Sequence, residues 1–114
     1  KAIELDPQRP LTYSNKGTVM NRLGRYQEAL ECFDKTIELD SGCSAAYCNK
    51  GTALNSLNRD QEAIECYGSA IELDPQSSFA YTQKGATLNR LRRYQEAVEC
   101  CDKAIESDPR SLLQ

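Results

Sequence analysis

Six side-chain amides recur along this chain at intervals of thirty-four residues. They form two rows, the first with Asn15, Asn49 and Gln83 and the second with Asn21, Asn55 and Asn89. Each carboxamide offers a carbonyl acceptor and an amide donor. A peptide backbone offers one acceptor and, except at proline, one donor per residue, so regularly spaced amides can hold an extended segment without requiring particular side chains. These rows predict hydrogen bonding to an extended peptide.

No comparable arrangement favours catalysis, a metal or a cofactor. The 114 residues contain no His, no nucleophile beside a base and no glycine-rich phosphate loop. Six cysteines are present without C-x-x-C spacing. Because Cys32, Cys66 and Cys100 follow the same thirty-four-residue interval, we expect reduced, packed thiols. The sequence therefore predicts a protein that is not an enzyme and uses no cofactor.

Charge and hydropathy limit the partners that this chain is expected to bind. The net charge of -3, the pI of about 5.0 and the absence of a basic stripe give no reason to expect a nucleic acid. No apolar run approaches the roughly 20 residues of a membrane span, so no membrane association is expected. The sequence leaves the localisation open and favours the cytoplasm.

The interval is not confined to the amides, because three whole blocks repeat. They begin at Pro10, Ser44 and Ser78, and most of the Tyr, Lys, Gly, Glu and Cys residues of one block reappear at the same places in the others. A fixed period of this length is typical of a stacked repeat array, in which each repeat buries its apolar surface against its neighbours. Such arrays usually bind other macromolecules.

Each block contains two helical patterns. In the first block the apolar face of one helix includes Tyr13, Gly17, Met20 and Leu23, and that of the next includes Tyr26, Ala29, Leu30, Phe33 and Ile37. The first helix is predicted to begin at Pro10 and to stop at Gly24. Its central glycine costs about 1 kcal/mol relative to alanine. We expect this glycine to let the two helices approach closely, with Phe33, Tyr67 and Cys101 filling the adjacent space in successive blocks.

This pattern resembles the tetratricopeptide repeat (TPR), a helix-turn-helix unit of thirty-four residues. The match rests on several places in all three blocks, although Tyr13 replaces the frequent Trp and Lys16 the usual Leu. The resemblance implies an all-α fold, a right-handed superhelical array of antiparallel helix pairs. It makes residues 1–114 a single array. Residues 1–9 end a preceding second helix, residues 10–43, 44–77 and 78–111 form three repeats, and residues 112–114 begin a further one.

The resemblance also implies a concave groove, made mostly from the first helix of each repeat, in which partners bind. Its register gives ten candidate residues for a peptide-binding groove: Asn15, Asn49, Gln83, Asn21, Asn55, Asn89, Arg22, Arg90, Leu11 and Phe79. Three alternatives stay open. The second amide row could brace a neighbouring repeat, the two arginines could be simply solvated, and Phe79 could only pack between repeats.

Some relatives clamp the C-terminal carboxylate of heat-shock chaperones with Lys, Asn and Arg side chains. At the corresponding places this chain carries Ser14, Thr18, Asn49, Phe79 and Gln83. Only Asn49 agrees, so we expect no carboxylate clamp in these three repeats.

The prediction is therefore an interaction module, a scaffold or adaptor that holds an extended peptide segment of a partner protein. Two alternatives use the same array differently. Copies could associate end to end, because both ends of the array are expected to expose apolar surface. The array could also be the substrate-recognition arm of a larger enzyme.

Overall fold

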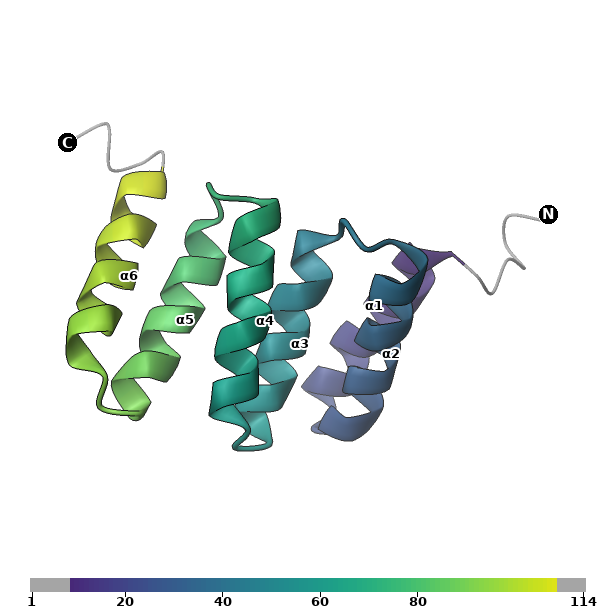
Figure 1. Ribbon diagram of the computed structural model, residues 1–114. Coiled ribbons are helices and arrows are strands. Elements are labelled where there is room, and N and C mark those ends of the chain that lie inside the picture. The colour runs from purple at the N-terminus through teal and green to yellow at the C-terminus, as the bar shows by residue number, and fades with distance from the viewer. Residues whose placement is uncertain (1–8, 109–114) are drawn as a thin grey trace.

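A computed structural model describes residues 9–108, which form six helices and, within that range, no strand (Figure 1). The helices are α1 (Pro10–Arg22), α2 (Tyr26–Leu39), α3 (Ser44–Ser56), α4 (Asp60–Leu73), α5 (Ser78–Arg90) and α6 (Tyr94–Ser107). The predicted all-α array of antiparallel helix pairs is confirmed. The expected end of a preceding helix and the expected start of a further repeat lie outside the described residues, except for Arg9.

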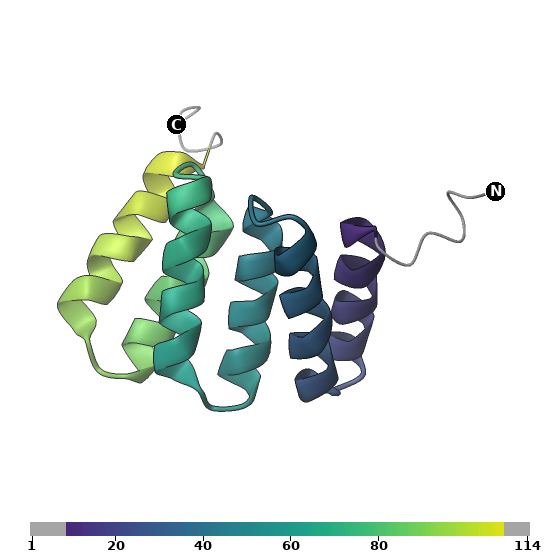
Figure 2. The same cartoon turned by 45° about the vertical axis from the view of Figure 1, so that its right-hand side comes forward.

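The six helices stack side by side along one direction, as Figures 1 and 2 show from two sides. Each helix contacts the next in sequence. In addition, α1 contacts α3 and α3 contacts α5, whereas no Cα atom of α2 lies within 8 Å of one in α4, and no Cα atom of α4 lies within 8 Å of one in α6. The first helices of the pairs are therefore packed closer together than the second helices, so the array bends with α1, α3 and α5 on its inner side.

The corner between the two helices of each pair needs a left-handed residue. Gly24 has φ 78°, Asn58 φ 63° and Arg92 φ 63°, so the corner has the same backbone form in all three repeats. Glycine adopts this conformation without strain and asparagine tolerates it, but an arginine pays a steric cost there. Arg92 is therefore a poor residue for this corner, and the fold imposes the left-handed turn on it nevertheless.

Close approach of the paired helices rests on the central glycines. A Cβ atom built on Gly17 would lie 2.7 Å from Cε1 of Phe33, and one on Gly51 would lie 2.5 Å from Cε1 of Tyr67. Both rings are fully buried. The expected steric reason for glycine is thus confirmed in the first two repeats. At Gly85 the nearest atom would be Sγ of Cys101 at 3.2 Å, because no ring occupies that place.

All six cysteines are free thiols, as expected. Cys32, Cys48 and Cys100 are buried, and Cys43 and Cys66 are half-buried. Cys101 departs from the expectation of a packed thiol because it is exposed on α6. It stands where the first two repeats place a buried ring.

The substitution Gly51→Ala should destabilise the protein although alanine favours helix by about 1 kcal/mol. The added methyl would overlap the buried Tyr67 ring, and overpacking of this kind costs about 1–3 kcal/mol. Gly85→Ala is the matched control, since the exposed Cys101 side chain can move away. Urea unfolding should give Gly51→Ala the lower free energy of unfolding by at least about 1 kcal/mol. Equal effects would contradict this account of the glycines.

Candidate functional site

The first amide row lies on the inner helices with part of its hydrogen-bonding capacity unused. Asn15 on α1 is exposed and Asn49 on α3 is half-buried, and within residues 9–108 neither side-chain amide makes a hydrogen bond. Gln83 on α5 is half-buried, and its side chain interacts with the Tyr67 hydroxyl. The Asn15 and Asn49 amides are therefore available to a ligand at equivalent places on successive helices.

Two hollows accompany this row at matching places of adjacent repeats. The first, of about 250 Å³, lies between α1, the end of α2 and the start of α3, and Leu11 and Asp40 line it. The second, of about 370 Å³, lies between α3 and the start of α5, and Asn49, Asp74 and Phe79 line it. Ala45 lines both, so the hollows are neighbours. Leu11 and Phe79 are exposed at their edges and provide apolar surface there.

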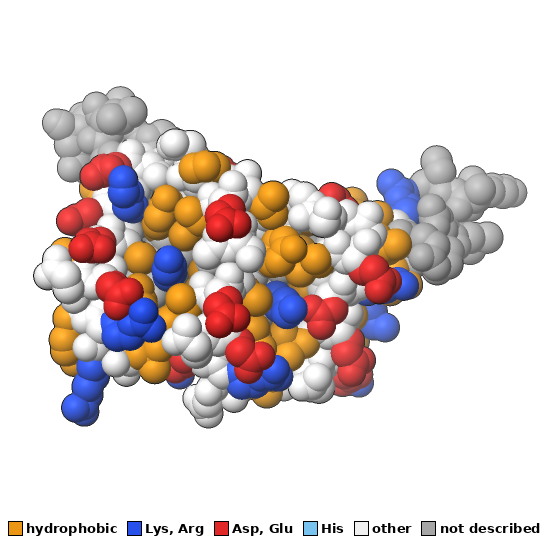
Figure 3. All heavy atoms as spheres, viewed as in Figure 1, with side chains coloured by type: hydrophobic (Ala, Val, Ile, Leu, Met, Phe, Trp, Pro, Cys, Tyr) orange, Lys and Arg blue, Asp and Glu red, His pale blue; other side chains and the backbone are white. Residues whose placement is uncertain are grey.

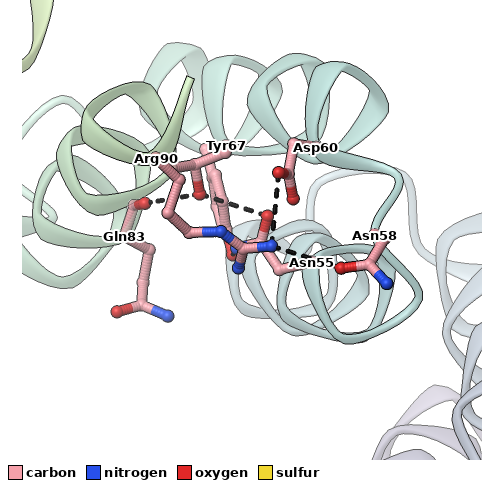
Figure 4. Close-up of polar contacts among 7 residues, drawn as sticks. Asn55, Asn58, Asp60, Tyr67, Gln83 and Arg90 are labelled. Carbon is pink, nitrogen blue, oxygen red and sulfur yellow. Dashed lines mark hydrogen bonds and ion pairs between the residues drawn. The ribbon is translucent and has the colours of Figure 1, made fainter. Parts of the chain in front are cut away.

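The second amide row is tied into the fold in the middle repeat (Figure 4). The Asn55 side chain donates from Nδ2 to the Tyr67 hydroxyl at 2.7 Å, and its Oδ1 accepts from the Thr87 hydroxyl at 3.1 Å. Thr87 belongs to α5, and its single hydroxyl proton is shared between Asn55 and the Gln83 backbone carbonyl, which lies 2.9 Å from the hydroxyl oxygen. Asn55 therefore links its own helix pair to the following repeat, which is the bracing that the sequence left open as an alternative.

The same bracing is missing at the other two places of this row. Around Asn21 the partners that correspond to Tyr67 and Thr87 are Phe33 and Ala53, which have no hydroxyl. Its Oδ1 is buried and has no hydrogen-bond partner among the described residues. Asn89 is exposed on α5. One repeated amide thus occurs in three environments, and a ligand-binding role for this row stays a prediction.

The two candidate arginines also differ. Arg90 forms an ion pair with Asp60 at 3.3 Å and donates to Oδ1 of Asn58 at 3.4 Å, and Figure 4 shows its guanidinium group between these two side chains. Asp60 stands where the other repeats carry Tyr26 and Tyr94. Arg22 is exposed and forms no ion pair within the described residues. Arg90 is therefore partly engaged by the preceding repeat, which reduces what it can offer to an acidic ligand.

Burial controls the ionisation of two groups beside the groove. It raises the pKa of the Cys48 thiol to about 11, and the nearby Asp74 carboxylate adds to the effect. Burial also raises the pKa of the Tyr67 hydroxyl, while hydrogen bonding with Thr52 and Gln83 opposes the rise. Both groups are therefore neutral near pH 7, and Cys48 is a packing residue rather than a reactive thiolate.

The face that carries the second helices has a mixed charge pattern. Figure 3 shows acidic, basic and hydrophobic side chains interspersed on it. Lys50 reaches Asp34 of the preceding repeat at 2.6 Å. In every repeat the arginine before the second helix pairs with the glutamate three residues later, as in Arg59 with Glu62 at 2.8 Å. No field of a single charge sign covers this face.

Sequence reasoning did not single out Thr87 and Asp60, and it treated Tyr67 only as a space-filling residue. Each of them departs from the residue that occupies the same place in the first repeat, since Phe33, Ala53 and Tyr26 stand there. The signal in the sequence that could have found them is the variation between copies, because the predicted sites were defined by the residues that the copies share.

Comparisons with known proteins agree with this architecture. The family model described as "Tetratricopeptide repeat" matches residues 8–76, and a second model of the same description matches residues 78–111. The chain therefore belongs to the tetratricopeptide repeat family. A comparison with curated proteins finds no match.

Several solved structures share the fold. The second TPR domain of Spaghetti (RPAP3), bound to the HSP90 peptide SRMEEVD, is 21% identical with a TM-score of 0.85 over 95% of this chain and 100% of that one. The first TPR domain of the same protein, bound to the same peptide, is 25% identical with a TM-score of 0.86 over 90% and 81%. The Arabidopsis OM64 TPR domain is 24% identical with a TM-score of 0.85 over 89% and 84%.

Residues 9–108 contain no group of three or more His, Cys, Asp or Glu side chains placed to hold a metal ion. Within the same residues no helix has both the length and the apolar character needed to cross a membrane.

Ala53→Thr should stabilise the protein by supplying the partner that Asn21 lacks. The new hydroxyl would stand where Thr87 stands toward Asn55 and would donate to Oδ1 of Asn21, a gain of about 0.5–1.5 kcal/mol. Ala53→Val, which has the same shape without the hydroxyl, is the control. Thermal or urea unfolding should rank the threonine variant above the valine variant. The difference should vanish in an Asn21→Ala background, and its persistence there would refute the assignment.

Stability should fall in alkaline solution partly through Cys48. Because the folded state holds this proton more tightly than the unfolded state, the stabilising effect is complete below about pH 9 and is lost as the pH rises toward 11. Urea unfolding near pH 8 and pH 10.5 should show a smaller alkaline loss for Cys48→Ala than for the wild type, whatever the variant's pH-independent offset. Equal losses in the two proteins would show that Cys48 does not contribute.

Proposed function

We propose that this chain is a protein-interaction module that holds an extended peptide segment of a partner along α1, α3 and α5. The observation that carries this proposal is the pair of unengaged amides on successive inner helices, Asn15 and Asn49. Asn49 lines the second hollow, and Ser14, the residue before Asn15, lines the first. Amides spaced along a groove suit the donors and acceptors of a peptide backbone. Leu11 and Phe79 would contact apolar side chains of the peptide.

The relatives with solved structures support the peptide class of ligand. Two of them, the TPR domains of Spaghetti (RPAP3), are structures with a bound HSP90 peptide, SRMEEVD. A scaffold or adaptor role for this chain follows if its partner is likewise a segment of another protein. In this function the chain binds and does no chemistry. Serving as the substrate-recognition arm of an enzyme would use the same groove.

The groove does not suit an acidic C-terminal peptide. Of the places that clamp a carboxylate in some relatives, only Asn49 carries a matching residue. Arg90, the candidate arginine on α5, is already paired with Asp60, and the acidic residues Asp40 and Asp74 are among those that line the two hollows. We therefore expect the ligand to be held through its backbone and its apolar side chains, without a terminal carboxylate.

Binding can be measured with a peptide selected on the immobilised chain from a random library of dodecamers. Asn15→Ala combined with Asn49→Ala should weaken its binding about tenfold or more, since two hydrogen bonds of about 0.5–1.5 kcal/mol each are lost. Gln27→Ala combined with Gln95→Ala removes two exposed amides from the second helices and should leave the affinity unchanged. Fluorescence anisotropy of the labelled peptide gives both values.

Two further measurements separate backbone recognition from other modes. Alternate N-methylation of the selected peptide removes backbone donors and should reduce its affinity, because the amides would lose their partners. The peptide SRMEEVD should bind weakly and without competing for the selected peptide. If the selected peptides bind the double alanine variant as tightly as they bind the wild-type protein, peptide binding by the amide groove is refuted.

A further inference from the structure

The outward face of α6 is apolar, and no part of the described chain covers it. Val98 is 54% exposed, whereas the matching residues of the first two repeats, Leu30 and Ile64, are 5% and 8% exposed. Tyr94 and Ile105 are also exposed on α6. In the first two repeats the next inner helix, α3 or α5, packs against this place. The α6 face therefore has the shape of a surface that receives an inner helix.

A cavity of about 420 Å³ opens on this face between α5 and α6. Gly85, Val98 and Cys101 are among its lining residues. It exists because Cys101 stands where the rings of Phe33 and Tyr67 fill the corresponding space in the first two repeats. The helix that packs here must therefore bring apolar side chains to fill this space.

The inner helix α1 has this property. Its Val19 occupies the place of Ala53 in α3 and Thr87 in α5, both of which are buried against the preceding repeat. Val19 itself is exposed, as is Leu23 at the end of the same helix. A valine is larger than alanine and more apolar than threonine, which suits the open apolar space beside Cys101.

We propose that copies of this chain associate head to tail, with α1 of one copy packed against α5 and α6 of another in the placement that α3 has against α1 and α2. Val19 of the second copy enters the cavity beside Cys101, and Leu23 covers Val98 and Tyr94. The occupant of the α6 face is thus a second copy of the chain. This association uses both faces at the ends of the described array and leaves Asn15 and Asn49 free, whereas Asn89 lines the cavity that becomes filled.

Charges at the rim support the same placement. Within the chain, Lys50 of α3 pairs with Asp34 of α2 at 2.6 Å. Shifted by one repeat, Lys16 of the second copy faces Asp102 of the first, and neither forms an ion pair within the described residues. The intermediate repeat cannot form this pair, because Gly68 stands opposite Lys84. Among the described residues Asp102 is therefore the aspartate of this pair that has no lysine opposite it, and Lys16 is the lysine that the second copy would bring to it.

A second polar contact within the chain would also be repeated between the two copies, whereas one contact between like charges would oppose their association. Arg93 donates to Oε1 of Gln61 in the preceding repeat at 3.3 Å, so Arg25 of the second copy would reach Gln95. Against this, Arg22 of the second copy would approach Arg92. Both arginines are exposed, so solvent and salt screen the repulsion, and its cost is small relative to the apolar contact.

The symmetry of the contact makes the proposal distinguishable from simple dimerisation. An α1 face on an α6 face is a heterologous contact, which leaves one free face at each end and allows further copies to add. Pairing of two α6 faces would be isologous and would stop at a dimer. Analytical ultracentrifugation of the 114-residue chain over a wide concentration range should give a mass that rises from 12.8 kDa past twice that value.

Two variants that each block one face give the decisive measurement. Val19→Glu and Val98→Glu alter residues that are exposed in the single chain, so each should keep its helical circular dichroism and cooperative unfolding. Alone, each should stay monomeric at concentrations where the wild type associates. Mixed in equal amounts, they should form a 1:1 dimer and nothing larger, because the intact α6 face of one meets the intact α1 face of the other. Leu73→Glu, an exposed apolar residue on α4, is the control and should associate like the wild type.

The proposed ion pair between Lys16 and Asp102 provides an independent test that leaves the apolar residues unchanged. Lys16→Asp and Asp102→Lys should each weaken association several-fold, and their combination in one chain should restore most of it. A wild-type mass that stays at 12.8 kDa at every concentration would overturn the proposal. So would dimerisation of Val19→Glu by itself, since that requires α6 to pair with α6. Failure of the two Glu variants to form a 1:1 dimer when mixed would overturn it as well.

Discussion

The close contact between a glycine of the first helix and a buried side chain of the second is the constraint on which the array depends. With a ring packed 2.7 Å from the Cβ position of Gly17 and 2.5 Å from that of Gly51, no larger residue fits without moving a fully buried group. This contact sets the distance between the paired helices. Because the pairs then stack with α1, α3 and α5 in mutual contact, it also fixes which helices form the inner side and where the amide rows lie.

The residue that faces this glycine explains most of what differs among the three repeats. Phe33 gives a purely apolar contact and offers Asn21 no hydroxyl, and Ala53, in the place of Thr87, leaves the buried Oδ1 of Asn21 without a partner among the described residues. Tyr67 keeps the ring and adds a hydroxyl, which anchors Asn55 and through it Thr87 of the next repeat. Cys101 removes the ring and leaves a cavity on the α6 face. The side chain at this one place thus determines the local packing, the hydrogen bonding between repeats and whether the α6 face has a cavity.

A polar residue that recurs in every repeat can either bond within the array or bind a ligand. Where an amide finds partners inside the array, as Asn55 does, its bonds increase rigidity and reduce what it can offer to a ligand. Where it finds none, as at Asn15 and Asn49, it is available for binding. Arg90 follows the same rule, since Asp60 in place of a tyrosine engages it. The candidate site is therefore selected from the repeated residues by what each repeat leaves unpaired.

The sequence by itself determined the fold, because a thirty-four-residue period with two helical patterns, a helix-central glycine and a matched apolar residue admits few packings. It also placed the first corner at Gly24, and the structure has the same corner one and two periods later, at Asn58 and Arg92. Only the tertiary structure decided which repeated side chains are free. Asn21, Asn55 and Asn89 are identical in sequence, yet their environments differ through residues about twelve and thirty-two positions away. Hydrogen bonding depends on the groups that surround a side chain in space, and the periodic sequence pattern does not specify those groups.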